Sequence, residues 1–271
     1  MKKKEKVPPA SGNAENFKKE RSARFTKILY TLVLLSFILP IGFIIVRLIF
    51  SPDVSENAAG YHSRADYVLM LVECLLGIIV IHIPSMLAKK FEFRLPTLLY
   101  ILYIVFLYCA IFLGEVRSFY YIIPHWDTIL HTMSSIMTGF FGVMVVYILN
   151  RDEHVVVKLS PFFISLFAFS FAVTIGSLWE IYEYTFDGIL GLNMQKFATS
   201  EGVNLVGHEA LRDTMKDIIV DALGALCASV IGYISIKFEK PWFRPELTDE
   251  ESEKAADAAD AAADTDKKKK A

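Results

Sequence analysis

The chain has 271 residues, a formal charge of −2, a 54% share of hydrophobic residues and a mean hydropathy of +0.42. The apolar residues fall in long blocks, which excludes an ordinary soluble domain. No feature of the sequence indicates nucleic-acid recognition. Membrane lipids are therefore the expected partners, and the sequence points to no particular protein partner.

Six apolar segments are long enough to cross a hydrocarbon core about 30 Å thick, which takes about 20 helical residues. In chain order they are Ile28–Phe50, Asp66–Ala88, Thr97–Gly114, Asp127–Leu149, Ser160–Phe186 and Asp213–Lys237. The third is the shortest, and the fifth is long enough to tilt or to emerge from the membrane. The predicted fold is all-α: a polytopic membrane helix bundle of about six transmembrane helices, within residues 27–238.

Two polar tails flank this transmembrane domain. Residues 1–26 are basic and residues 239–271 are acidic and then low in complexity, so both are expected to be disordered. Nine Lys and Arg residues precede the first span, and the segments after the second, fourth and sixth spans are also basic. Because cytoplasmic loops carry the excess of Lys and Arg, both termini are predicted to be cytoplasmic.

In this topology the polar end of the fourth span faces outward. The span opens with Pro124-His125-Trp126-Asp127, and His131 follows Asp127 by four residues, which places both on one helix face. A charge inside a bilayer costs roughly 2.5–3.5 kcal/mol, so such groups are functional candidates. The alternative is that Asp127 caps the helix and His131 is a hydrogen-bonded interfacial residue.

The outer end of the fifth span carries Glu180, Glu183 and Asp187, spaced as one stripe of a helix. Three carboxylates at a helix C-terminus repel each other and oppose the helix dipole, which favours a bound cation. Asp187 is equally consistent with a solvated rim beyond the membrane. Trp179 and Tyr182 are typical of an aromatic interfacial belt.

The sixth span begins with a second acidic stripe, Asp213, Asp217 and Asp221, at four-residue spacing. The stripe is about 12 Å long. Asp213 is also a candidate helix cap. Asp221 precedes Gly224 and Ala225, small residues that let helices approach closely, so it is not expected to be a solvated surface residue.

Four further ionisable residues are weaker candidates. Glu73 lies in the outer half of the second span, and Glu115 follows the third span, where it can pair with Arg117. His82 lies nearer the cytoplasmic end and is expected to have a hydrogen-bonded packing role. The three cysteines show neither metal-ligand nor disulfide spacing.

The outer side holds more carboxylates than basic side chains. Either several carboxyl groups keep their protons, or one or two divalent metal ions bind. Histidine with carboxylates suits Zn²⁺, Mn²⁺ or Fe, and carboxylates alone suit Mg²⁺ or Ca²⁺. The candidate metal ligands are Asp127, His131, Glu183, Asp217 and Asp221, with Glu180 or His125 as the general base.

The polar motifs resemble those of the YjdF-like family of uncharacterised bacterial multi-pass inner-membrane proteins. The motifs are His125-Trp126-Asp127 with His131, Trp179-Glu180 with Glu183, and Asp213-Thr214-Met215-Lys216-Asp217 with Asp221-Ala222-Leu223-Gly224-Ala225. The resemblance covers roughly residues 25–240. It implies a multi-pass location in the bacterial plasma membrane and carries over no chemistry.

The favoured functional hypothesis is a metal-dependent membrane hydrolase or transferase acting at the outer leaflet. A bound metal ion would lower the pKa of a water ligand to near 7. The motifs HExxH and GxSxG and the P-loop are absent. One alternative is a proton- or ion-coupled transporter, although the polar motifs do not repeat between the two halves of the chain. A further alternative is a structural metal-binding scaffold or sensor.

Overall fold

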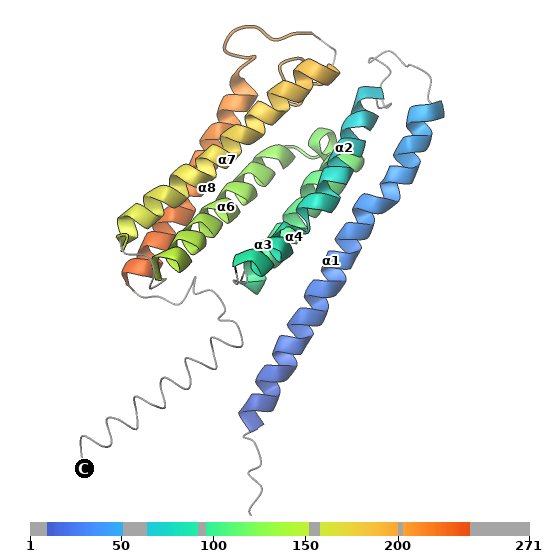
Figure 1. Cartoon of the computed structure of the whole chain (residues 1–271). Coiled ribbons are helices and arrows are strands. Elements are labelled where there is room, and N and C mark those ends of the chain that lie inside the picture. Colours follow the sequence, from blue (N-terminus) through green and yellow to red (C-terminus); the bar gives the residue numbers. More distant parts are fainter. Residues whose placement is uncertain (1–9, 51–63, 92–95, 152–157, 200–202, 239–271) are drawn as a thin grey trace, which may run out of the picture.

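A computed structural model of the chain describes residues 10–50, 64–91, 96–151, 158–199 and 203–238, and this part is almost entirely helical (Figure 1). Six of its helical segments are long and apolar enough to cross a membrane, which confirms the predicted fold. They are Glu20–Phe50, Arg64–Leu87, Thr97–Val116, Trp126–Tyr147, Pro161–Leu190 and Arg212–Lys237. The predicted spans agree with these bounds to within a few residues at most ends, because length and apolarity alone identify a membrane helix.

The first helix, α1, runs from Ala10 to Phe50 and therefore includes most of the segment that was expected to be a disordered tail. Residues 10–26 contain good helix formers, and Arg24 and Glu20 form an ion pair one helical turn apart, at 3.8 Å. Residues 1–9 and the expected C-terminal tail, 239–271, lie outside the described residues.

The second span is broken near its C-terminal end. Helix α2 (Arg64–Val80) ends before a turn at Ile81 and His82, and α3 (Ile83–Phe91) begins directly before Pro84, whose ring disfavours a continuous helix here. The His82 Nε2 atom lies 2.9 Å from the Tyr30 hydroxyl and its Nδ1 atom 2.6 Å from the Ile78 carbonyl oxygen. The predicted hydrogen-bonded packing role of His82 is confirmed.

The third span changes helix type halfway. Helix α4 (Thr97–Leu107) continues as a π-helix, η1 (Tyr108–Val116), followed by the short α5 (Phe119–Ile122). The π-helical turns are wider than α-helical ones and are common at functional sites. Gly114 lies against the Tyr120 ring, and a Cβ atom there would come within 2.4 Å of the ring. The close approach holds the Tyr120 ring against the end of this span.

The last three helices pack closely on one another: α6 (Trp126–Arg151), α7 (Pro161–Leu190) and α8 (Arg212–Lys237). Small residues permit this packing, since a Cβ atom at Gly139 would lie 2.7 Å from the Ala228 Cβ atom. We call α6, α7 and α8 the three-helix unit. Helices α1, α2 and α4 and the π-helix η1 form the N-terminal unit, around buried Phe37, Cys74 and Ile104.

The ends of the helices separate into two levels. Figure 1 shows the beginning of α1 and the end of α8 at one end of the bundle, and the beginnings of α6 and α8 and the end of α7 at the other. This second end carries the acidic stripes predicted from the sequence. The helical framework therefore brings the two stripes and the Asp127 turn to the same level.

Candidate functional site

The three-helix unit buries a cluster of acidic residues around one histidine. Helix α6 contributes Asp127 and His131, α7 contributes Glu180, and α8 contributes Asp217 and Asp221. The exposed fraction is 6% for His131, 4% for Glu180 and at most 2% for the two α8 aspartates. Ionisable groups are rarely buried to this extent unless they are paired or bind an ion.

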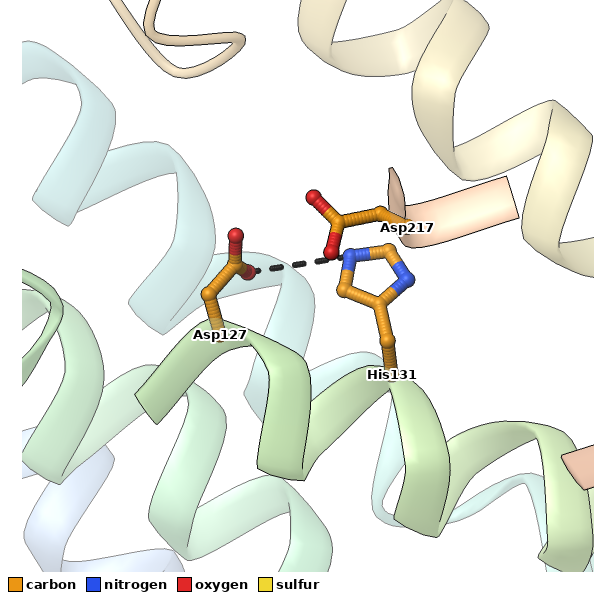
Figure 2. A group of neighbouring side chains, drawn as sticks. All are labelled: Asp127, His131 and Asp217. Carbon is orange, nitrogen blue, oxygen red and sulfur yellow. Dashed lines mark ion pairs between the residues drawn. The ribbon is translucent and has the colours of Figure 1, made fainter. Parts of the chain in front are cut away.

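Asp127, His131 and Asp217 form the centre of this cluster. One ligand atom from each of the three side chains lies within 4.8 Å of the others, and Figure 2 shows the side chains converging from α6 and α8. The Nε2 atom of His131 lies 3.6 Å from an Asp127 carboxylate oxygen. Three of the five predicted metal ligands thus occupy a common space.

Asp221, also predicted as a ligand, lies on the other side of the imidazole. Its Oδ2 atom is 3.1 Å from His131 Nδ1. When Asp221 is ionised its carboxylate can only accept, so Nδ1 then donates this hydrogen bond, and Nε2 faces Asp127 and Glu180. Such a carboxylate partner fixes the tautomer and orientation of a metal-binding histidine. Asp221 is therefore positioned to orient His131.

Close packing against α7 holds Asp221 in place. A Cβ atom at Gly176 would lie 2.1 Å from Asp221 Oδ2 and 2.8 Å from its Cγ atom. Only glycine leaves room for the carboxylate at this position. The sequence pointed to Gly224 as the small residue near Asp221, but Gly224 lies against Ser135 of α6.

Several carboxylate oxygens of the cluster lack a hydrogen-bond donor. Within the described part of the chain, both Glu180 oxygens and Oδ1 of Asp217 and Asp221 are buried without such a partner. The nearest ionisable group to Glu180 that the structure records is His131, whose Nε2 atom lies 3.7 Å from Oε1. A buried polar atom without a partner costs about 1–3 kcal/mol, which calls for a proton or a cation in this space.

A lysine on the loop after α7 bonds two aspartates at the edge of the cluster. The Lys196 ammonium group donates hydrogen bonds to Asp127 Oδ2 at 2.7 Å and to Asp213 Oδ2 at 2.9 Å. Burial opposes the charged form of Lys196, but the two aspartates outweigh it and raise the pKa of the ammonium group. Asp213 thus binds Lys196 and makes no capping hydrogen bond at the start of α8.

The other two carboxylates of the α7 stripe have separate roles. Glu183 accepts a hydrogen bond of 2.9 Å from the indole nitrogen of Trp179. The sequence predicted Trp179 only as part of an aromatic interfacial belt. Asp187 accepts hydrogen bonds from the backbone amides of Met194 and Gln195, at 2.7 and 3.0 Å. Asp187 therefore fastens the loop after α7, and Glu183 lies outside the group formed by Asp127, His131 and Asp217.

His125, predicted as an alternative general base, is exposed and lies outside the buried cluster. It has a φ angle of 61°, in the left-handed region, at the turn before α6. It lines a separate cavity of about 280 Å³ together with Lys196, Asp213 and Lys216. The structure brings Glu180, and not His125, next to His131.

Two larger cavities meet at Asp127. One, of about 420 Å³, lies between the N-terminal unit and the three-helix unit, and Glu73, Asp127, His131 and Asp221 contribute its carboxyl and imidazole groups. The second, of about 310 Å³, also touches Glu73 and Asp127 and opens on Glu115 and Glu183, among others.

Tyr120, which the sequence did not single out, lines all three of these cavities. Burial, followed by the carboxylates of Glu115 and Glu73, raises the pKa of its hydroxyl group well above the ordinary value. The phenol is therefore a neutral donor beside several acids. A tyrosine in a four-residue helix between two spans carries no sequence pattern that distinguishes it from an interfacial aromatic residue.

Comparison with known proteins places the chain among uncharacterised membrane proteins. Residues 54–238 match the family model described as "Predicted membrane protein (DUF2238)". An uncharacterised protein of Thermotoga maritima is 32% identical over 123 residues, which are 45% of this chain and 54% of that protein. No solved structure matches. The matches are consistent with the YjdF-like resemblance, which stays a prediction. Because the family model covers more than half of the chain, the protein belongs to the DUF2238 family of predicted membrane proteins.

Proposed function

We propose that the protein is a metal-dependent hydrolase or transferase of the bacterial plasma membrane, acting at the outer leaflet. The observation that supports it most is the buried group of Asp127, His131 and Asp217, whose ligand atoms lie within 4.8 Å of one another. Imidazole with carboxylates is a donor set that suits Zn²⁺, Mn²⁺ or Fe. These three side chains are the proposed ligands.

The unpartnered oxygens around this group support a cation there. Glu180, Asp217 and Asp221 all have buried carboxylate oxygens that receive no hydrogen bond from the described residues. Two lysines lie close by. Lys196 is already bound to Asp127 and Asp213. Lys216 donates a hydrogen bond to Thr128 and comes only within 4.0 Å of Asp217 Oδ1. A divalent ion would offset the mutual repulsion of the carboxylates, which one imidazolium group could offset only in part.

The remaining residues of the cluster can be assigned separate chemical roles. A bound ion would supply an activated water and polarise the oxygen of a substrate carbonyl or phosphoryl group. Asp221 holds the His131 ring in the orientation that turns Nε2 toward Asp127. Glu180 lies 3.7 Å from Nε2, and both of its carboxylate oxygens are buried without a hydrogen-bond partner among the described residues, so we assign it the role of general base.

Metal content and turnover test this proposal. Purified wild-type protein should contain a stoichiometric transition metal by mass spectrometry, and Asp217→Asn should lose it. Glu209→Gln, which changes an exposed carboxylate paired with Arg212, is the matched control and should keep it. Glu180→Gln should keep the metal but hydrolyse lipid esters or phosphoesters about 10²- to 10⁴-fold more slowly. Metal-free wild-type protein would refute the proposal.

A proton- or ion-coupled transporter is the second candidate, because buried carboxyl groups without donors are also expected of groups that carry protons. It predicts proton flux into liposomes that Glu180→Gln abolishes, without bound metal. A structural metal-binding scaffold or sensor predicts metal-dependent stability with no turnover. The same two purified variants therefore distinguish all three functions.

We further propose that both termini are cytoplasmic, so that the acidic cluster faces the outside. The support is the distribution of Lys and Arg. The basic start of α1 and the last turn of α8, with Lys237, lie at the end of the bundle opposite the cluster (Figure 1). Labelling of exposed loop residues in intact cells tests this orientation.

A further inference from the structure

The cavity between the N-terminal unit and the three-helix unit has polar residues at one end and apolar residues at the other. Its volume of about 420 Å³ is in the range of small-molecule sites. Asp127 and His131 lie on its wall near the outer end of α6. Val80, which lies about 10 Å further along α2 than Glu73, lines the deeper part with apolar neighbours such as Phe106.

The cavity also has an apolar side opening. Helices α2 and α7 both line it, yet they make almost no direct contact with each other. The lining side chains along this seam are apolar and substantially exposed: Leu76 by 39%, Ile175 by 40% and Leu178 by 54%. Since α2 and α7 are long and apolar enough to cross a membrane, side chains exposed between them are expected to meet the hydrocarbon of the bilayer.

We infer that this cavity binds the acyl chain of a membrane lipid, which enters between α2 and α7 and brings its headgroup linkage beside Asp127 and His131. The reaction at that linkage rests on the proposed function, whereas binding of the chain does not. The occupant follows from the surroundings of the cavity, because a lipid chain is the apolar ligand that the bilayer presents to an opening at this depth.

The energetics favour a chain over water. A lipid chain is as apolar as the side chains that line the cavity, so it moves in from the bilayer at little cost. Water in the same apolar space would leave hydrogen bonds unmade. Selectivity for one lipid then comes from the polar end, where Glu73, Asp127 and His131 meet the headgroup.

Photo-crosslinking tests the inference directly. The protein is reconstituted in vesicles of phosphatidylethanolamine and phosphatidylglycerol that contain phosphatidylglycerol with a diazirine near the end of one acyl chain. After irradiation, mass spectrometry should find label on Val80, Tyr103 and Phe106, which line the deep part of the cavity. Ala110→Phe, which fills the cavity, should reduce this labelling several-fold.

Two further variants control for the fold and for general contact with lipid. Ile175→Trp enlarges a side chain at the opening without repacking the core, and should reduce the labelling even if Ala110→Phe fails to fold. Leu223→Trp changes a 58% exposed residue of α8 that does not line the cavity, and should leave it unchanged.

The opposite results overturn the inference. Label confined to exposed positions such as Leu98 and Leu223, or cavity label that Ile175→Trp leaves unchanged, means that no chain enters between α2 and α7. Metal content is measured on the same samples. Cavity label on metal-free protein supports the chain site and refutes the metal-dependent function. Bound metal without cavity label refutes the chain site and supports the metal-dependent function.

Discussion

The contact between Gly176 and Asp221 provides the sharpest test of the proposed site. Gly176→Ala adds one methyl group that would lie 2.1 Å from Asp221 Oδ2. To restore an ordinary contact the carboxylate must move by about 1.3 Å, and the Oδ2 atom that must move is the one bonded to His131. A shift of this size would disturb the length and alignment of the hydrogen bond to Nδ1, which is now 3.1 Å long.

The expected loss can be estimated from this hydrogen bond. A bond to a charged group contributes about 1.5–3 kcal/mol, and loss of the carboxylate that orients a metal-binding histidine lowers metal affinity about 10- to 100-fold. Titration of metal-stripped protein with Zn²⁺ or Mn²⁺ measures the affinity. Gly188→Ala is the matched control, since it gains the same helix propensity on α7 and meets no atom within 4 Å.

A double-mutant cycle shows whether the effect acts through Asp221. If it does, Gly176→Ala should weaken metal binding no further when Asp221→Ala is already present. Equal metal affinities for Gly176→Ala and Gly188→Ala, or strictly additive losses in the double variant, would refute the assignment of Asp221 as the residue that positions His131.

Three further predictions concern the outer surface of the site. Lys196→Gln removes the cation shared by Asp127 and Asp213 and should lower the free energy of unfolding by about 1 kcal/mol, with partial recovery in Lys196→Arg, as measured by thermal denaturation in detergent. His125→Asn, which tolerates the left-handed backbone, should leave metal content and turnover unchanged, and a large loss of either would restore His125 as a candidate base. Val206→Cys in a cysteine-free background should react with an impermeant maleimide from outside intact cells, and labelling only after lysis would invert the proposed topology.

Most of the helical framework could be predicted because it depends on composition. A segment of about 20 apolar residues has few alternatives to a membrane helix, since every backbone polar group must be satisfied within the segment. The same rule does not describe breaks inside a span. The turn at His82 and the π-helix that ends at Val116 depend on local backbone hydrogen bonds, which average hydropathy does not report.

Spacing identified residues that share a helix face, but it could not show which partner each of these residues meets. Spacing predicted that Asp127 and His131 share a face, and their 3.6 Å approach confirms it. The acidic residues of α7 were predicted as one stripe, yet they have different partners: Glu180 faces His131, and Asp187 binds the following loop. Spacing shows which side chains share a face but not what that face meets.

The sequence by itself determined that this is a six-span helical membrane protein with its acids at one level, because span length and the alternation of direction are properties of the chain alone. The tertiary structure decided which acids surround His131, which of them stay unpartnered and where the apolar cavity lies. These features depend on the rotation and close approach of each helix against the next, and contacts such as Gly176 with Asp221 join residues that lie far apart in the chain.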